Sequence, residues 1–320
     1  MQTFSIAIHG GAGTILKQDM TAELEAAYIK GLEDALSAGY SVLEKGGTAL
    51  NAVAAAVVSL ENCIMFNAGK GSVFTKNGTH EMDAAIMDGK SLDAGAVAGV
   101  SSVKNPVELA LAIMQKSEHV LLSGDGALQF AKQQGLKIED EAYFFSQFRC
   151  DQWQLVKDED KIALDHNIQV EKPSSTKTTA GKKFGTVGAV ACDRYGNIAA
   201  STSTGGMTNK NYNRIGDSPI IGAGTYANNK TCAISCTGHG ELFLKAVAAY
   251  DISCLMEYKG MSLQEAMDFV TLDKLVKING EGGMVGVDAK GNTALVFNSD
   301  GMYRAMQNSN GEKQIAIYRY

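Results

Sequence analysis

The stretch Gly185-Thr186-Val187-Gly188-Ala189-Val190-Ala191-Cys192 marks the point where the character of the chain changes. From about Cys150 to Gly185 the sequence is polar and is typical of a mobile connector, whereas the apolar run that begins at Thr186 is typical of a buried strand. If the peptide bond before Thr186 is cut, this residue carries both a hydroxyl nucleophile and a free amine that can act as its base. Gly185 tolerates the strained backbone that such a cut requires. The sequence therefore predicts a chain that cleaves itself.

Threonine is common in strands, where most threonines only pack, so this prediction depends on other segments. Two later segments supply hydroxyl groups and glycine backbone of the kind that such a nucleophile needs: 201–209 (Ser-Thr-Ser-Thr-Gly-Gly-Met-Thr-Asn) and 236–241 (Cys-Thr-Gly-His-Gly-Glu). An α-amine has an ordinary pKa of roughly 7.7 to 8.0, so an appreciable fraction is unprotonated near neutral pH and accepts the hydroxyl proton. The combination indicates an amidohydrolase.

Apolar periodicity divides the rest of the chain into helices and strands. Helices are predicted at 22–43, 49–60, from Asn105-Pro106 onward, and at 126–134, 240–258 and 262–276. Strands are predicted at 4–8, within 72–103, at 119–122, and on both sides of the turns 193–197 and 288–292. Because strands and helices come in blocks, without strict βαβ alternation, the order favours an α+β fold with antiparallel sheets. The length permits one large domain or two small ones.

Composition excludes several classes of function. The 320 residues carry a net charge of −6 and contain no long basic run, which argues against a nucleic-acid partner. No window approaches the roughly 20 apolar residues of a membrane span, and Met1-Gln2-Thr3 lacks the basic start of a secretion signal. The six cysteines form no CxxC pair, which suits reduced thiols. We expect a soluble, cytoplasmic protein.

Other motifs give weaker signals. Gly89-Lys90-Ser91 ends like a phosphate-binding loop but lacks the leading glycine, and no GxGxxG is present. Cys232, Cys236 and His239 invite a metal interpretation, but alternate spacing in an apolar strand explains the cysteines as core residues.

The glycine-rich segment 9–13 (His-Gly-Gly-Ala-Gly) resembles a hydrolase oxyanion loop, yet the chain has no GxSxG nucleophile elbow. We interpret it as a turn at a strand end that brings backbone close to a ligand, and a turn without any ligand remains open.

Arg214 and Asp217 lie three residues apart between glycine and proline turns. The fork of an arginine binds a carboxylate through two hydrogen bonds, and an aspartate accepts hydrogen bonds from an ammonium group. Together they suit the zwitterionic end of asparagine or of a β-aspartyl peptide. The alternative is an ordinary solvated ion pair, which stabilises a protein little.

Several of these segments, in this order, closely resemble the plant-type L-asparaginase/isoaspartyl peptidase family of N-terminal nucleophile hydrolases. The resemblance begins at the glycine-rich segment 9–13 and spans nearly the whole chain. The segments that carry it are 185–190, 203–206, 214–219 (Arg-Ile-Gly-Asp-Ser-Pro) and 237–241. It implies a single domain, a four-layer αββα sandwich, cut between Gly185 and Thr186 into an α subunit of residues 1–185 with a mobile tail from about 150, and a β subunit of residues 186–320. It also implies a dimer of these αβ units.

The resemblance also implies a role for each site residue. Thr186 is the nucleophile in maturation and in turnover, Thr204 orients it, and the Thr237 hydroxyl and Gly238 N–H stabilise the oxyanion. Substrate contacts come from Arg214, Asp217, Gly240 and Asn67. A structural sodium ion is held by the main-chain carbonyls of Leu60, Glu61, Cys63, Phe66, Ala68 and Lys70, and no cofactor is needed for catalysis. Phe184 departs from the histidine of many relatives, so cleavage is expected to be slower or to use different local geometry, and His239 has no catalytic role.

The implied reaction is hydrolysis of L-asparagine to aspartate and ammonia, and of β-aspartyl dipeptides to aspartate and an amino acid. Two alternatives remain. One is a glycosylasparaginase, which shares the nucleophile but admits a sugar on the amide nitrogen. The other is an uncleaved relative that binds amino acids without catalysis.

Overall fold

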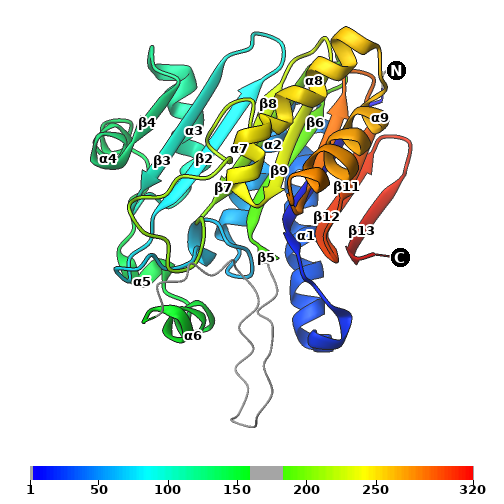
Figure 1. The fold of residues 1–320 in the computed structure, drawn as a ribbon. Helices are drawn as coiled ribbons and strands as arrows, with labels where there is room; N and C mark the ends of the chain where they lie inside the picture. The colour runs from blue at the N-terminus through cyan, green and yellow to red at the C-terminus, as the bar shows by residue number, and fades with distance from the viewer. Residues whose placement is uncertain (1–2, 159–182, 320) are drawn as a thin grey trace.

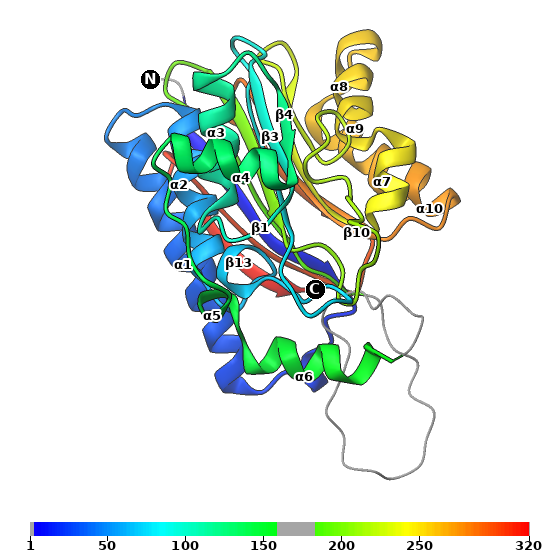
Figure 2. The ribbon, with the colours of Figure 1, turned by 90° about the vertical axis from the view of Figure 1, so that its left-hand side faces the viewer.

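The computed structural model describes residues 3–158 and 183–319 of the chain. Two sheets lie face to face, and helices cover the outer side of each (Figures 1 and 2). This arrangement confirms the predicted α+β class and the four-layer αββα sandwich.

The larger sheet contains the strand that starts at Thr186. Across the sheet the strands are β13 (Lys313–Tyr318), β12 (Gly301–Asn308), β1 (Ser5–Gly13), β6 (Thr186–Cys192), β7 (Ile198–Thr204), β2 (Met82–Asp88), β3 (Ala94–Val100) and β4 (Leu121–Ser123). The short β5 (Lys183–Phe184) pairs with the end of β1. All pairs are antiparallel except β3 with β4, which differs from the prediction. The chain between these two strands contains a helix, and a crossover of this kind returns the next strand in the same direction.

The smaller sheet is antiparallel throughout. Its order is β11 (Thr293–Phe297), β10 (Gly282–Asp288), β9 (Cys232–Gly238) and β8 (Thr225–Ala227). Tight turns join β6 to β7 and β10 to β11, as predicted, and Asp193 and Asp288 accept the turn N–H groups of Asn197 and Asn292.

Helices α1 (Ala22–Glu44), α2 (Ala49–Asn62) and α3 (Pro106–Lys116) cover the larger sheet, close to their predicted limits. The hydroxyls of Thr21 and Thr48 cap the first two helices by accepting backbone N–H bonds. At the edge of this layer lie α4 (Gly124–Gln133), α5 (Glu141–Phe144) and α6 (Gln147–Val156) (Figure 2).

The helices over the smaller sheet are more broken than the sequence predicts. The segment predicted as one helix at 240–258 is α7 (Gly240–Ala246) and α8 (Ala248–Lys259), because Val247 between them has a left-handed backbone with φ of 49°. The next predicted helix, 262–276, is α9 (Leu263–Asp268), a π-helical turn (Phe269–Lys274) and α10 (Leu275–Lys277). Helix α7 begins at Gly240, two residues after the end of β9.

Three apolar cores separate the four layers. One lies between the larger sheet and its helices, one between the smaller sheet and its helices, and one between the two sheets. Cys232 and Cys236 are packing residues of the second core, and all six cysteines are free thiols.

Three sequence interpretations need correction. The first strand runs on through Gly13 with an irregular register between His9 and Ala12, so the glycine-rich segment is part of β1 and is not a turn after it. Residues 72–81 lie outside the strands, although Asn77-Gly78 forms a turn. Helix α6 extends to Val156 and occupies the start of the predicted connector, while residues 159–182, on which most of the predicted tail falls, lie outside the described residues. Within 3–158 and 183–319, no helix has the length and apolar character needed to cross a bilayer.

Candidate active site

The predicted nucleophile and its predicted neighbour are cross-strand partners. Thr186 starts β6 and lies directly opposite Thr204 at the end of β7. The Thr186 hydroxyl donates to Thr204 Oγ1 at 3.2 Å, and the backbone N–H of Gly206 donates to the same oxygen at 3.0 Å. The exposed fractions of the two threonines are only 7% and 3%. The sheet therefore holds the Thr186 hydroxyl in one direction.

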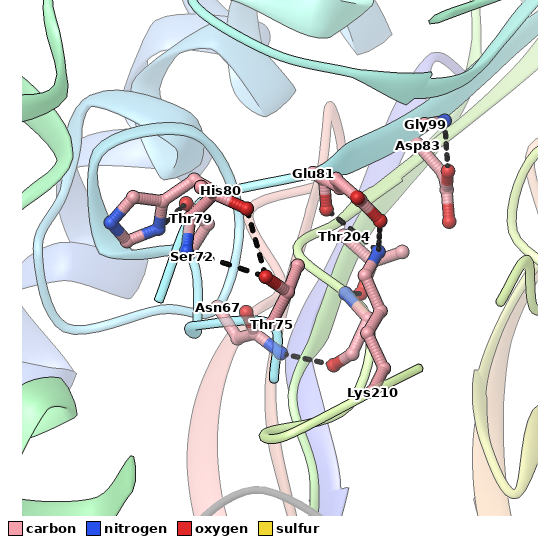
Figure 3. A network of polar contacts seen from close by, with 11 residues as sticks. Asn67, Ser72, Thr75, Thr79, His80, Glu81, Asp83, Gly99, Thr204 and Lys210 are labelled. Atoms are coloured by element: carbon pink, nitrogen blue, oxygen red, sulfur yellow. Dashed lines mark hydrogen bonds and ion pairs between the residues drawn. The ribbon is translucent and has the colours of Figure 1, made fainter. Parts of the chain in front are cut away.

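Asn67 braces the turn that follows Thr204. Its Nδ2 donates to Gly206 O at 2.7 Å (Figure 3). Its Oδ1 accepts from Val73 N at 3.0 Å. A Cβ atom on Gly205 would overlap Asn67 Oδ1, so the close approach requires glycine. Asn67 therefore lies beside the turn after Thr204, and its side-chain amide is engaged inside the protein.

A buried charged group, which the sequence interpretation did not single out, supports the other side of Thr204. Asp83 on β2 is the cross-strand partner of Thr204, and its Oδ1 accepts from Gly99 N at 2.7 Å (Figure 3). Lys210 Nζ donates to Glu81 O at 2.8 Å, and its side chain is almost fully buried. Burial raises the pKa of Asp83, while the nearby Lys210 ammonium acts to lower it. The sequence signal that could have identified Asp83 is its position as an ionisable residue inside the otherwise apolar segment 82–87.

Thr237 and Gly238 form the end of β9. Thr237 is fully buried, and its Oγ1 has no hydrogen-bond partner among the described residues. A Cβ atom on Gly238 would overlap the Phe243 ring and lie 2.6 Å from Glu281 O, so only glycine fits. A buried hydroxyl without a partner is costly, and it is a group that a bound oxyanion can satisfy.

Arg214, Asp217 and Gly240 converge on one point. A Cβ atom on Gly240 would lie 2.7 Å from Arg214 Nη2 and 2.9 Å from Asp217 Oδ1. The guanidinium of Arg214 is bound by both oxygens of Glu241, through Nε at 2.8 Å and Nη2 at 2.9 Å. The predicted pair is therefore assembled, but Arg214 already has a carboxylate partner from the protein.

The carboxyl group of Asp217 is unusual in its burial and in its raised pKa. Its Oδ2 is buried without a hydrogen-bond partner in the described part of the chain. Burial raises the pKa of Asp217 to about 7, although Arg214 acts to lower it. Arg214 in turn lowers the pKa of the half-buried Glu241. An ammonium group bound at Asp217 would favour its ionised form.

A histidine connects the nucleophile to the facing sheet. His9 on β1 bonds Thr186 O through Nδ1 at 3.0 Å and Ser235 Oγ through Nε2 at 2.8 Å. Ser235 lies two residues before Thr237 on β9, so the two side chains point to the same face of that strand. His9 thus links Thr186 to the strand that carries Thr237 across the space between the sheets.

Comparison with known proteins matches residues 1–317 to a family described as asparaginase. This chain belongs to the asparaginase family. It is 49% identical to the isoaspartyl peptidase of Salmonella typhimurium and 48% identical to that of Escherichia coli, with 98% of this chain and 98% and 96% of those proteins covered. The human isoaspartyl peptidase/L-asparaginase is 39% identical over 93% of this chain and 91% of its own length.

The resemblance implies a main-chain cation site in the loop 60–71 of this asparaginase-family chain. A Cβ atom on Gly69 would lie 2.5 Å from Glu61 O, and one on Gly71 would overlap Phe66 O, so carbonyls crowd the inside of the loop. The Glu61 side chain is not available as a ligand, because it accepts from Ser203 Oγ at 2.7 Å and from Val107 N at 3.0 Å. Hard monovalent cations prefer such oxygens. In the described residues, no group of three or more His, Cys, Asp or Glu side chains is placed to hold a metal ion.

Proposed function

We propose that this chain is an N-terminal nucleophile amidohydrolase that hydrolyses L-asparagine and β-aspartyl dipeptides through Thr186. The observation that carries the proposal is the Thr186 hydroxyl held on Thr204 directly after Gly185, at the first residue of a buried strand. The names of the relatives, isoaspartyl peptidase and isoaspartyl peptidase/L-asparaginase, support the choice of substrate.

Maturation uses the same hydroxyl. Thr186 Oγ attacks the carbonyl carbon of Gly185, the C–N bond breaks as the proton passes to the amine, and Gly185 is left as an ester on Thr186. Water then hydrolyses this ester and releases a carboxylate on Gly185 and a free α-amine on Thr186. The products are an α subunit of residues 1–185 and a β subunit of residues 186–320.

In turnover the free amine of Thr186 accepts the proton of its own hydroxyl, and Oγ attacks the side-chain amide carbon of the substrate. The Thr237 hydroxyl and the Gly238 N–H donate to the oxyanion, which fits the buried, unpartnered Thr237 Oγ1. Collapse expels ammonia or an amino acid, which takes the proton from the amine. Water then hydrolyses the β-aspartyl ester and regenerates Thr186.

Substrate recognition follows from charge. Asp217 accepts hydrogen bonds from the α-ammonium of the aspartyl group, and Gly240 contributes its backbone beside it. Arg214 binds the α-carboxylate, for which the guanidinium shares or releases its bonds to Glu241. Both substrates present the same aspartyl half to these groups, so the leaving group can vary.

We also propose a structural sodium ion in the loop 60–71, bound by the carbonyls of Leu60, Glu61, Cys63, Phe66, Ala68 and Lys70. The assembly we propose is a dimer of αβ units in the cytoplasm. The resemblance to the family and the crowded carbonyls of this loop support the ion, and the resemblance alone supports the dimer.

The test combines intact mass after incubation, N-terminal sequencing and product release. We expect two fragments, the second starting at Thr186, and release of ammonia from L-asparagine and of an amino acid from β-aspartyl dipeptides. A single full-length species without turnover would instead indicate the non-catalytic binder. Faster release from glycosylated asparagine than from either substrate would indicate a glycosylasparaginase.

A further inference from the structure

A chain of buried polar side chains crosses the otherwise apolar space between the two sheets. His9 (β1), Ser235 (β9), Thr202 (β7) and Thr225 (β8) are all fully buried. Ser235 Oγ lies 2.7 Å from Thr202 Oγ1, and Thr225 Oγ1 lies 2.7 Å from Thr202 Oγ1. With the two bonds of His9, the chain reaches from β8 to the carbonyl of Thr186.

Elementary chemistry sets the direction of the two bonds that His9 makes. Thr186 O is a carbonyl and can only accept, so His9 Nδ1 carries the proton. Burial lowers the pKa of His9 to about 3, so the ring is neutral near pH 7 and its Nε2 is an acceptor. Ser235 therefore donates its single proton to His9.

The same reasoning continues outward from Ser235. Because the Ser235 proton is used, Ser235 Oγ can only accept from Thr202, whose hydroxyl also donates to Gly224 O at 3.2 Å. Thr225 donates to Thr202 Oγ1 and to Ser218 O at 3.0 Å. The bonds from Ser235 to His9 and from His9 to Thr186 O therefore run in one direction, toward Thr186. Bonds aligned in this way polarise and strengthen one another.

Gly188 leaves the space that this chain occupies. A Cβ atom on Gly188 would overlap Ser235 Oγ and lie 2.5 Å from His9 Nε2. The bond between His9 and Ser235 therefore explains why position 188 is a glycine.

We propose that His9 is a positioning residue, which holds the carbonyl of Thr186 and thereby fixes the direction of its amine relative to its hydroxyl. The inference rests on the function proposed above, and the consequence is greatest after maturation. Once the bond to Gly185 is cut, Thr186 is a chain end, and chain ends are poorly ordered unless tied down. The carbonyl bond to His9 and the hydroxyl bond to Thr204 then act on opposite sides of one residue.

Two variants separate positioning from packing. In His9→Asn the side-chain amide nitrogen takes the place of Nδ1 and can still donate to Thr186 O, whereas in His9→Gln it takes the place of Nε2 near Ser235. Glutamine is closer to histidine in volume, so if His9 acts by packing alone, His9→Gln should retain more activity than His9→Asn. If His9 positions the Thr186 carbonyl, His9→Asn should retain more activity than His9→Gln.

We expect His9→Asn to keep kcat within about tenfold of the unmodified chain and His9→Gln to lose about 100-fold, because small misplacements of reacting groups have effects of this size. KM for L-asparagine should stay within about threefold in both, since Arg214 and Asp217 are untouched. His119→Gln, at an exposed histidine, is the matched control and should change nothing. Equal or higher kcat in His9→Gln, or a rise in KM alone, would overturn the proposal.

A second measurement does not depend on turnover or on the folding of a variant. In ¹⁵N–¹H spectra of histidine side chains we expect the ring assigned to His9 to carry its proton on Nδ1, unchanged between pH 8 and pH 5. Free histidine prefers the other tautomer and has a pKa near 6.5. A proton on Nε2 of His9, or titration of the His9 ring near pH 6.5, would contradict the inference. Absence of cleavage in the unmodified chain with the expected tautomer would instead count against the proposed function.

Discussion

The two ends of the candidate site differ in how their polar groups are satisfied. At the nucleophile end, the polar side-chain atoms of Thr186, Thr204 and Asn67 are hydrogen-bonded within the protein, although the neighbouring Asp83 keeps one buried oxygen, Oδ2, without a partner among the described residues. At the substrate end, Thr237 Oγ1 and Asp217 Oδ2 are buried without partners among the described residues. Thr186 and Thr204 lie on neighbouring strands, whereas Asn67, Arg214 and Asp217 lie in loops.

This difference corresponds to the order of events in the proposed reaction. The attacking group has to be oriented before the substrate arrives, and bonds within a sheet orient it. The oxyanion and ammonium partners are supplied by the substrate, so the groups that bind them are left unpaired at a cost in stability. Four predictions test this division.

The largest effect is expected at the nucleophile. Thr186→Ala removes the attacking hydroxyl and should leave the chain uncut and lower turnover by at least about 10⁴-fold. Denaturing electrophoresis and ammonia release measure the two outcomes. Cleavage at Gly185 that persists in this variant would show that another group attacks the bond.

The same substitution at the two ends should have opposite effects on stability. Thr237→Val removes an oxyanion donor and should lower kcat by about 10²- to 10³-fold. It should leave the free energy of unfolding unchanged or raise it by about 1 kcal/mol, because the lost hydroxyl is buried and unpaired.

Thr204→Val is the matched control for this prediction. It leaves Gly206 N–H without its acceptor, so we expect a loss of about 1 to 3 kcal/mol in unfolding by denaturant. If Thr237→Val and Thr204→Val lower the free energy of unfolding equally, the proposed difference between the two ends of the site is wrong.

Arg214→Lys should act mainly on binding. Lysine keeps the charge but cannot form the paired bonds of the guanidinium fork, so KM should rise by about 10- to 100-fold while kcat changes little. Steady-state kinetics with L-asparagine and with a β-aspartyl dipeptide should show the same rise, because both present the same carboxylate. An effect on one substrate alone would place Arg214 at the leaving group.

The smallest effect concerns pH. Burial raises the pKa of Asp217 to about 7, so below that pH the free enzyme loses its ionised acceptor for the ammonium. The Thr186 amine must also be unprotonated, so the logarithm of kcat/KM should fall with a slope near 2 below about pH 7. A bound ammonium keeps Asp217 ionised, so kcat should fall with a slope near 1. Asp217→Asn should reduce the first slope to 1, and an unchanged slope of 2 would remove Asp217 from substrate binding.

Much of the fold could be predicted from local signals. The limits of α1 and α2 follow from their apolar spacing and threonine caps, and Pro106 marks the start of α3. The breaks at Val247 and in the π-helical turn could not, because an αL valine and a widened helix leave no local pattern in the sequence. The parallel pairing of β4 likewise depends on the crossover through α3.

The site residues were predictable where a motif carried them, and their partners were not. Glu241 was visible only as the last residue of segment 236–241, yet it binds Arg214 with both oxygens. Asp83 and Lys210 come from distant segments and meet beside Thr204 only in the folded chain.

The sequence alone determined the α+β class, the position of the expected cut and the residue types that can attack, stabilise and bind, because these depend on local composition and spacing. Only the tertiary structure decided which nitrogen of His9 carries the proton and which buried groups stay unpaired. Residues hundreds of positions apart, such as His9 and Ser235, form a hydrogen bond only when the fold brings them close in space. The periodicity of the sequence carries no information about such a contact.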